Sequence, residues 1–313
     1  MRKNFTAIAA AALALGVGSA VAADLPSRKA PAYLPPPPPP WTGFYAGLNA
    51  GGTFGADDGV TVGNGALYAT PFPAPALAQS SALAASAAGT FGPLSTNNGG
   101  FIGGGQVGYN YQLGSAGLNA FLVGIEADIQ GIAGSNSSVS AFGAAPMPLV
   151  GPGFNVFSAT QATRQLDYLG TVRGRLGFLV TPTLLLYGTG GLAYGGVSSS
   201  TSVLQGFSAF TGPTGQAWGA AGSYSDTRVG WTAGGGVEWM FMPNWSAKVE
   251  YLYCDLGTVS YSSGVTGSFL TGTGAPLFLN GVTTSTRFNG HIVRVGVNYH
   301  FNLGAPAPVL AKY

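Results

Sequence analysis

The sequence predicts an all-β fold, an eight-stranded antiparallel up-and-down transmembrane β-barrel. Three observations support this fold. Segments of about ten residues alternate apolar and polar side chains, as membrane barrels do. The connections between these segments alternate long and short, and nearly all charged residues of the segments fall on one face. In barrels of bacterial outer membranes the apolar face meets lipid, and the short turns lie on the periplasmic side.

The last alternating segment, residues 288–301, shows the pattern most clearly. Its apolar row is Val293, Val295, Val297, Tyr299 and Phe301, and the row between is Arg294, Gly296, Asn298 and His300. Because successive side chains of a strand point to opposite faces, one face of this segment is apolar and ends in two aromatic rings. We therefore expect lipid against one face and a polar barrel interior against the other.

Four residues of this segment also resemble the assembly signal that closes the last strand of bacterial outer-membrane barrels. They are Arg294, Gly296, Tyr299 and Phe301. The resemblance implies that the barrel-assembly machinery recognises them. Residues 302–313 follow the signal and are predicted to form a C-terminal periplasmic tail.

The composition restricts the class of protein. Only 7% of the 313 residues are charged, and 52 residues are glycine, so uncharged groups supply most of the polarity. Without Arg2 and Lys3, which belong to the predicted signal peptide, ten basic residues balance ten acidic ones. A neutral chain has no basic surface for nucleic acid. Cys254 is the only cysteine, which excludes an intramolecular disulfide.

The N-terminus predicts export. Residues 1–23 have a basic start, an apolar centre and small residues before Asp24, the pattern of a cleaved signal peptide. Their apolar run is shorter than the about 20 residues of a spanning helix. Residues 24–40 end in six consecutive prolines and predict an extended periplasmic spacer. A docking site for a proline-recognising partner is the alternative.

The barrel is predicted to occupy residues 41–301. Its expected strands are 43–54, 101–113, 121–132, 165–180, 184–197, 227–241, 245–259 and 288–301. An even strand number suits a bacterial single-chain barrel. Aromatic residues gather at the predicted periplasmic ends of the strands, as an interfacial girdle requires. A second group is expected at the outer rim: Tyr168, Tyr194, Trp231, Tyr251 and Tyr253.

The alternation places charged side chains in the barrel interior. The predicted interior charge network is Glu126, Asp128, Arg173, Arg175, Glu238, Lys248, Glu250 and Arg294. A charge facing lipid at the bilayer midplane costs roughly 2–4 kcal/mol, whereas paired charges are tolerated inside. The residues are either an ionic plug that fills the barrel or the lining of a small ion pathway. A balanced set of charges favours the plug.

Together these features resemble the small outer-membrane β-barrel family of alphaproteobacteria, described as porin-like and outer-membrane immunogenic proteins and related to the OmpA-type eight-stranded barrel. The segments that carry the resemblance are 23–26 (ADLP), 41–47 (WTGFYAG), 172–177 (VRGRLG), 187–191 (YGTGG), 248–251 (KVEY) and 293–296 (VRVG). The resemblance implies an abundant surface protein of a Gram-negative outer membrane, without catalytic residues. The long, nearly uncharged loops depart from the family, so no loop function is carried over.

Catalytic, cofactor and metal sites are not expected. Residues 103–108 and 188–193 match glycine-rich nucleotide-binding patterns, but neither opens a helix after a strand. His291 and His300 share one strand and lack the further ligands that a metal site needs. No nucleophile motif accompanies His291, and we expect His300 to be a satisfied interior residue.

We therefore expect an outer-membrane protein with a structural or surface-display role, and the sequence leaves weak porin activity open. The alternatives are a diffusion channel for small solutes or ions and an adhesin or receptor that acts through the loops. Outer-membrane lipid and the assembly machinery are the expected partners. The sequence does not identify a loop partner.

Overall fold

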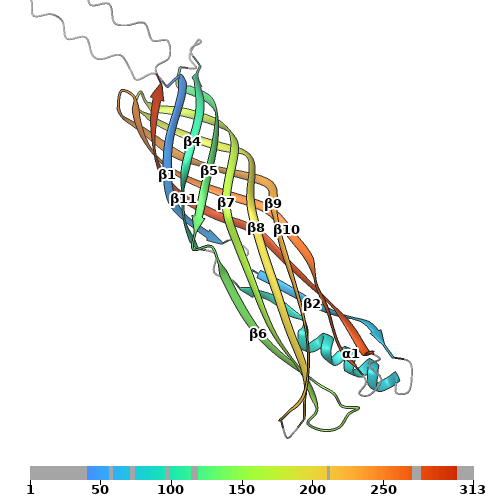
Figure 1. Ribbon diagram of the computed structural model, residues 1–313. Coiled ribbons are helices and arrows are strands. Elements are labelled where there is room, and N and C mark those ends of the chain that lie inside the picture. The colour runs from blue at the N-terminus through green and yellow to red at the C-terminus, as the bar shows by residue number, and fades with distance from the viewer. Residues whose placement is uncertain are drawn as a thin grey trace, which may run out of the picture. The chain divides into compact units, whose positions relative to one another are not determined.

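The computed structural model describes residues 41–55, 59–70, 75–95, 99–113, 119–209, 212–269 and 276–301. The predicted signal peptide, proline spacer and C-terminal tail (1–23, 24–40 and 302–313) lie outside these residues. Within the described ranges the chain forms eleven β-strands and one α-helix (Figure 1).

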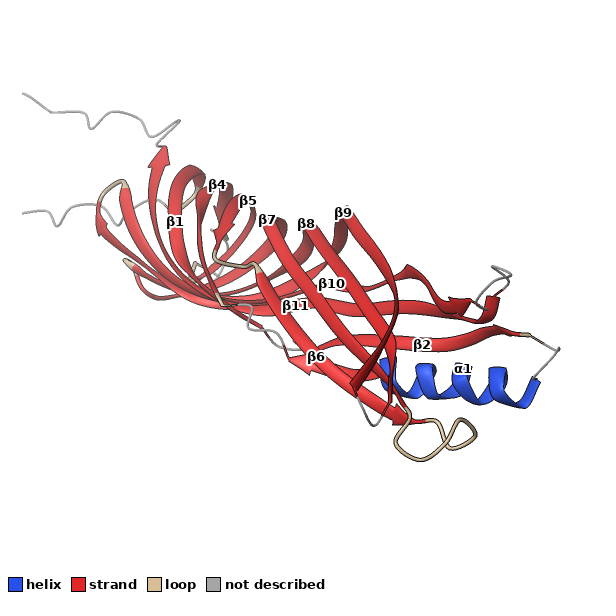
Figure 2. Ribbon diagram, turned by 60° about the horizontal axis from the view of Figure 1, so that its bottom comes forward, coloured by secondary structure: helices blue, strands red, loops and turns tan. Residues whose placement is uncertain are grey.

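Eight strands pair into a closed antiparallel ring (Figure 2). In ring order they are β1 (Gly43–Gly55), β4 (Gly100–Gln112), β5 (Phe121–Ala133), β7 (Asn155–Thr181), β8 (Leu184–Ala209), β9 (Gly212–Met242), β10 (Trp245–Phe269) and β11 (Pro276–Phe301). The ring closes between β11 and β1, where Phe44 lies opposite Phe301 and Gly55 opposite Gly290. The predicted all-β, antiparallel barrel is confirmed at this level.

The predicted number of strands was too low. Three further strands occupy segments expected to be loops: β2 (Gly59–Ala69), β3 (Phe91–Ser95) and β6 (Ser137–Pro146). β2 pairs with β11 and β3, and β6 pairs with β7. More than half of the residues of β2 and β6 are Gly, Ser, Ala or Thr, which weakens the contrast between apolar and polar faces that reveals a strand, and β3 has only five residues.

A helix, α1 (Pro75–Gly89), also lies in a segment expected to be a loop. Seven of its fifteen residues are alanine, the best helix former, and glycine ends it. Ala78, Ala82 and Ala85 are fully buried. Side-chain amides from the surrounding strands bind helix carbonyls: Gln205 Nε2 donates to Ala85 O and Asn280 Nδ2 to Ala82 O, both at 2.8 Å. Among the described residues, no helix is long and apolar enough to cross a membrane.

The last five ring strands are much longer than predicted. β7 to β11 contain 25 to 31 residues each, whereas a strand tilted across a bilayer needs about 9–11. The predicted strands cover only the ring portions of β7–β11. We call their remaining portions (155–164, 198–209, 212–226, 260–269 and 276–287), together with β2, β3, β6 and α1, the extension (Figure 1).

The outer surface of the ring is an apolar belt bordered by aromatic side chains. On β11, Val293, Val295 and Val297 are about half exposed. At one border, aromatic rings of neighbouring strands pack together in the pairs Phe44–Tyr109, Phe121–Phe178 and Trp245–Tyr299. At the other border the pairs are Trp231–Tyr253 and Tyr251–His291. The belt between the two aromatic rims is the surface that suits lipid.

Candidate functional site

The ring interior holds the eight charged side chains that the sequence analysis singled out. β5 contributes Glu126 and Asp128, β7 contributes Arg173 and Arg175, β9 contributes Glu238, β10 contributes Lys248 and Glu250, and β11 contributes Arg294. All eight are at most 5% exposed. Successive side chains of a strand point to opposite faces, and these eight lie on the inner face. There they form one cluster of four carboxylates and four cations.

Arg173 is the centre of this cluster. Its Nη1 donates to Glu250 Oε1 at 2.8 Å, and its Nη2 donates to Asp128 Oδ2 at 2.8 Å and to Glu126. Its Nε donates to Thr171 Oγ1 at 2.9 Å. One guanidinium group therefore joins three carboxylates from two other strands, and charge-assisted hydrogen bonds of this kind are stronger than neutral ones.

Two further cations connect the same carboxylates. Arg294 Nε donates to Glu250 Oε2 at 2.8 Å, and its Nη2 donates to Asp128 Oδ2 at 2.9 Å. Lys248 Nζ donates to both oxygens of Glu126, at 2.8 and 2.9 Å. The carboxylates of Glu126, Asp128 and Glu250 are thus each shared by at least two cations.

Arg175 and Glu238 form a second part of the cluster. Arg175 donates to Glu238, which also accepts hydrogen bonds from Ser246 and from Asn298 Nδ2. The Arg175 guanidinium lies 3.7 Å from the centre of the Tyr187 ring, a cation–π contact. Tyr45 links the two parts, since its hydroxyl donates to Glu126 Oε2 at 2.6 Å and accepts from Arg175 Nη1 at 3.2 Å.

Sequence reasoning missed these uncharged members of the cluster. In the sequence, Tyr187 and the repeated glycines near it blur the alternation of this strand. The structure buries Tyr187 and Leu185 inside the ring and exposes Leu186, so the strand alternates regularly. Strict application of the alternation to β1 would also have placed Tyr45 inside.

Apolar side chains cover the charge network on both sides. At the end with the short turns lies a cluster of Trp41, Leu122, Leu185, Tyr187 and Met240. Trp41 Nε1 donates to Pro182 O at 2.9 Å, which ties the indole to the turn between β7 and β8.

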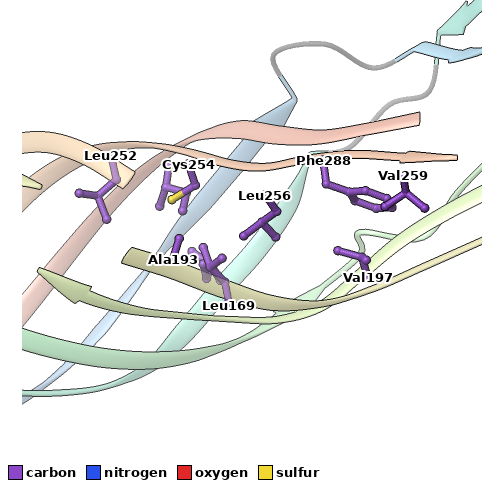
Figure 3. Packing of buried hydrophobic residues seen from close by; sticks show 10 residues of the cluster. Leu169, Ala193, Val197, Leu252, Cys254, Leu256, Val259 and Phe288 are labelled. Atoms are coloured by element: carbon purple, nitrogen blue, oxygen red, sulfur yellow. The ribbon is translucent and has the colours of Figure 1, made fainter. Parts of the chain in front are cut away.

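Towards the extension, a second apolar cluster fills the interior (Figure 3). Along β10, the charged Lys248 and Glu250 are followed on the same face by Leu252 and Cys254. Leu256 continues the row on β10, and Leu169 of β7, Ala193 of β8 and Phe288 of β11 belong to the same cluster. The charges therefore lie between two apolar layers, each built from side chains that are at most 5% exposed.

The two histidines occupy different environments. His300 is buried, with its Nε2 2.9 Å from Ser246 Oγ and 3.5 Å from Glu238 Oε1. A serine, a histidine and a glutamate thus meet, but the glutamate approaches the same ring nitrogen as the serine, whereas a triad acid binds the opposite one. Trp41 also packs edge-on against the His300 ring. His291 lies at the rim, where its Nδ1 is 2.6 Å from the Tyr251 hydroxyl.

No group of three or more His, Cys, Asp or Glu side chains in the described ranges could hold a metal ion. The glycine-rich patterns lie on strands β4 and β8 of the ring wall. A Cβ at Gly104 would lie 2.1 Å from Ile129 O, and one at Gly191 would lie 2.2 Å from Val172 O. These glycines permit close packing of the barrel backbone.

The residues that resemble the assembly signal divide between the two faces of β11. Arg294 belongs to the interior cluster. Tyr299 and Phe301 lie on the outer surface at the rim, with ring centres 5.1 Å apart, and Tyr299 also packs on Trp245. A Cβ at Gly296 would lie 3.2 Å from Leu48 O, so this position is nearly closed to larger residues. Recognition of these residues during assembly stays a prediction.

Comparisons with known proteins agree with this architecture. The family model described as outer membrane protein beta-barrel domain matches residues 9–301. The 31 kDa outer-membrane immunogenic protein of Brucella melitensis is 34% identical over 297 residues, which cover 94% of this chain and 98% of that protein. The 22 kDa outer membrane protein of Rhizobium leguminosarum bv. viciae is 31% identical over 171 residues, 54% of this chain and 59% of the relative.

The crystal structure of the outer membrane protein OprG from Pseudomonas aeruginosa is a weak match. It shares 10% identity at a TM-score of 0.37, over 83% of this chain and 97% of that one. The family model and the alphaproteobacterial relatives confirm the resemblance found in the sequence and the predicted location in a Gram-negative outer membrane. The chain belongs to the outer membrane protein β-barrel domain family.

Proposed function

We propose that this protein is a closed structural barrel that spans the outer membrane with its eight ring strands and displays the extension at the cell surface. It acts as neither an enzyme nor an open pore. The observation that carries the proposal is the balanced network of four carboxylates and four cations, held between two apolar layers.

The contacts of the network support closure. An ion passing through the ring would have to separate carboxylates and cations that already satisfy one another in a space with little water. Breaking a buried pair by removing one partner costs about 3–5 kcal/mol, and the shared carboxylates make each pair depend on the others. The ion would also have to pass Trp41 and Met240 at one end and Leu252 and Leu169 at the other.

The outer surface supports the membrane position. On β11 the apolar belt runs from His291 to Phe301, which fits the about 9–11 residues that a tilted strand needs to cross a bilayer. The short turns, at Pro182 between β7 and β8 and at Pro243 between β9 and β10, would face the periplasm. The extension then projects outside the cell, in agreement with a relative named as an immunogenic outer-membrane protein.

The partners follow from the same surfaces. Outer-membrane lipid would cover the apolar belt, and the barrel-assembly machinery would bind the end of β11 that contains Tyr299 and Phe301. A loop-binding surface partner is not part of the proposal.

The test is single-channel current through detergent-refolded protein in a planar bilayer, after a heat-dependent shift in gel migration has shown that the barrel is folded. We expect no discrete conductance steps from the folded protein. A known pore-forming barrel in the same bilayer controls for detection. The proposal fails if regular steps appear and their ion selectivity changes in the Arg173→Gln and Arg175→Gln variants, because the cluster would then line a conducting path.

A further inference from the structure

Hydroxyl and amide side chains are frequent on the outer surface of the extension next to the apolar belt, among exposed apolar residues such as Leu204 and Val265. Thirteen outward-facing side chains there carry hydroxyl or amide groups, and all are exposed or half-buried. They are Thr61, Ser138, Ser140, Gln161, Thr163, Ser200, Ser202, Ser223, Ser225, Ser260, Ser262, Thr283 and Ser285. We call them the hydroxyl collar.

The strand register arranges the collar in rows across neighbouring strands. Ser138, Thr163, Ser200 and Ser223 lie opposite one another on β6, β7, β8 and β9. A second row contains Ser140, Gln161 and Ser202. On β10, β11 and β2, Ser260, Ser285 and Thr61 form an equivalent row. The collar therefore lies on two sets of paired strands, β6–β9 and β10, β11 and β2.

The collar continues the lipid-facing surface directly. On β11 the outward row runs through Val295, Val293 and His291 in the ring, passes Asn289 and Arg287, and reaches Ser285 and Thr283 in the extension. On β8 it runs from Leu192 to Ser200 and Ser202. The same face thus changes from apolar, through aromatic and histidine side chains at the rim, to hydroxyl-bearing.

Charged side chains are few beside the collar: in the extension portions of the strands, Asp226 and Arg287 are exposed. A protein surface made only for solubility in water carries roughly 25–35% charged residues with both signs interspersed. Ser and Thr hydroxyls instead present donors and acceptors without charge. A partner of the collar should therefore be rich in hydrogen-bonding groups.

The surface is also hollowed where the rows meet. A depression of about 390 Å³ is lined by Gln161, Thr163, Ser200, Ser202 and Ser223, together with their neighbours. A second depression next to it includes the Phe142 side chain, which is 71% exposed. Hydroxyl groups beside an exposed aromatic ring suit a saccharide, whose hydroxyls form hydrogen bonds while its C–H groups pack on the ring.

We propose that the hydroxyl collar binds the saccharide chains of the outer-leaflet glycolipid around the barrel. The inference rests on the orientation proposed above, which places the collar just outside the hydrocarbon layer, at the depth of the glycolipid saccharides. A protein partner would need a patch on one group of strands, whereas a surrounding leaflet is matched by hydroxyl rows on both β6–β9 and β10, β11 and β2. The continuity of the collar with the apolar belt allows one glycolipid molecule to contact both.

The test compares three probes on full-length protein refolded in detergent. They are lipopolysaccharide with its complete core saccharide, lipid A without saccharide, and the free core oligosaccharide, with binding measured by isothermal titration calorimetry. We expect lipopolysaccharide to bind about tenfold more tightly than lipid A, the equivalent of one or two net hydrogen bonds. Equal affinity for the two glycolipids overturns the proposal. Equal affinity for free oligosaccharide and lipopolysaccharide also overturns it, because the ligand would then not be a component of the leaflet.

A collar variant locates the effect. Thr163→Val with Ser200→Val removes a hydroxyl pair whose oxygens are 2.6 Å apart, and Ser260→Val with Ser285→Val removes a second pair at 3.0 Å. Thr181→Val with Thr183→Val removes a comparable pair at the opposite end of β7 and β8 and is the matched control. We expect the collar variant, but not the control, to lose the tenfold preference. Retention of the preference by a folded collar variant overturns the proposal. If the variant does not fold, the comparison of the three probes on the unmodified protein tests the proposal by itself. This test measures no conductance. A failure of the saccharide proposal can therefore be distinguished from a failure of the proposed closed barrel.

Discussion

Arg294 Nη2 donates a hydrogen bond to Asp128 Oδ2 at 2.9 Å, although β11 and β5 are separated in the ring by β1 and β4. The bond therefore crosses the interior instead of following the barrel wall. Arg294 also binds Glu250 on the neighbouring strand β10. A single side chain of the last strand thus connects carboxylates on two different parts of the ring.

Replacing this cation should destabilise the folded barrel. Arg294→Met leaves the carboxylates with one cation fewer in a buried site, and removing one partner of a buried pair costs about 3–5 kcal/mol. The free energy of unfolding of detergent-refolded protein, from urea titration, measures the loss. Refolding without the assembly machinery separates this effect from the predicted role of Arg294 in assembly. A loss below about 1 kcal/mol, the usual value for an exposed pair, would contradict a dry network.

Removing a pair together should cost less than the two single changes suggest. Arg175 and Glu238 bind each other directly, so Arg175→Met or Glu238→Gln alone leaves an uncompensated charge. We expect the double variant to be more stable than the sum of the single effects by about 0.5–3 kcal/mol, the range for residues in contact. A double-mutant cycle with urea unfolding gives this coupling. Additive effects would show that the two charges are screened by water.

Glycines of the ring wall should differ sharply in their tolerance of a methyl group. A Cβ at Gly191 would lie 2.2 Å from the Val172 carbonyl oxygen, whereas one at Gly105 would have Gly47 O at 3.9 Å as its nearest neighbour. Gly191→Ala should therefore cost about 1–3 kcal/mol through overpacking. Gly105→Ala should be neutral or slightly stabilising, because it restricts the unfolded chain. The folded fraction after refolding and the urea midpoint test both variants, and equal behaviour would contradict the close backbone approach.

An ion pair beyond the outer aromatic rim should make stability depend on acidity. The hydrogen bond from Arg287 Nη2 to Asp255 lowers the pKa of this carboxyl below its ordinary value of 3.8. A lowered pKa contributes stability that is fully present above the ordinary pKa and is lost as pH falls through the lowered one. Arg287→Gln should therefore reduce the loss of stability on acidification below pH 3.8. Urea midpoints across this range measure it, with Lys248 and the other interior cations left unchanged. Identical pH profiles for the variant and the unmodified protein would refute the assignment.

The membrane environment explains why the ring was predictable from the sequence. Lipid requires large apolar groups outside and the interior accepts charge, so Val293, Arg294 and Val295 differ strongly along one strand. The alternation then places all eight charged residues on the inner face. Their pairing partners were not predictable, because Asp128 and Arg294 meet only once the ring curvature and register are known.

The extension could not be predicted, because its inner and outer faces differ little in chemistry. Water outside and small buried groups inside make Ser199 and Ser200 similar in sequence, although Ser199 is buried and Ser200 exposed. The strands therefore seemed to end at the aromatic rim. The segment of α1 was predicted to be a loop because its small Ala, Ser and Gly side chains form no distinct apolar stripe.

The position of Arg294 on the last strand has a consequence for the order in which the barrel can mature. A chain that has placed β5, β7, β9 and β10 but not β11 encloses four carboxylates with only Arg173, Arg175 and Lys248. Such an unfinished barrel carries an excess negative charge that hydrocarbon disfavours strongly. The final strand both closes the wall and cancels that charge. Only the completed ring therefore holds its four carboxylates together with four cations.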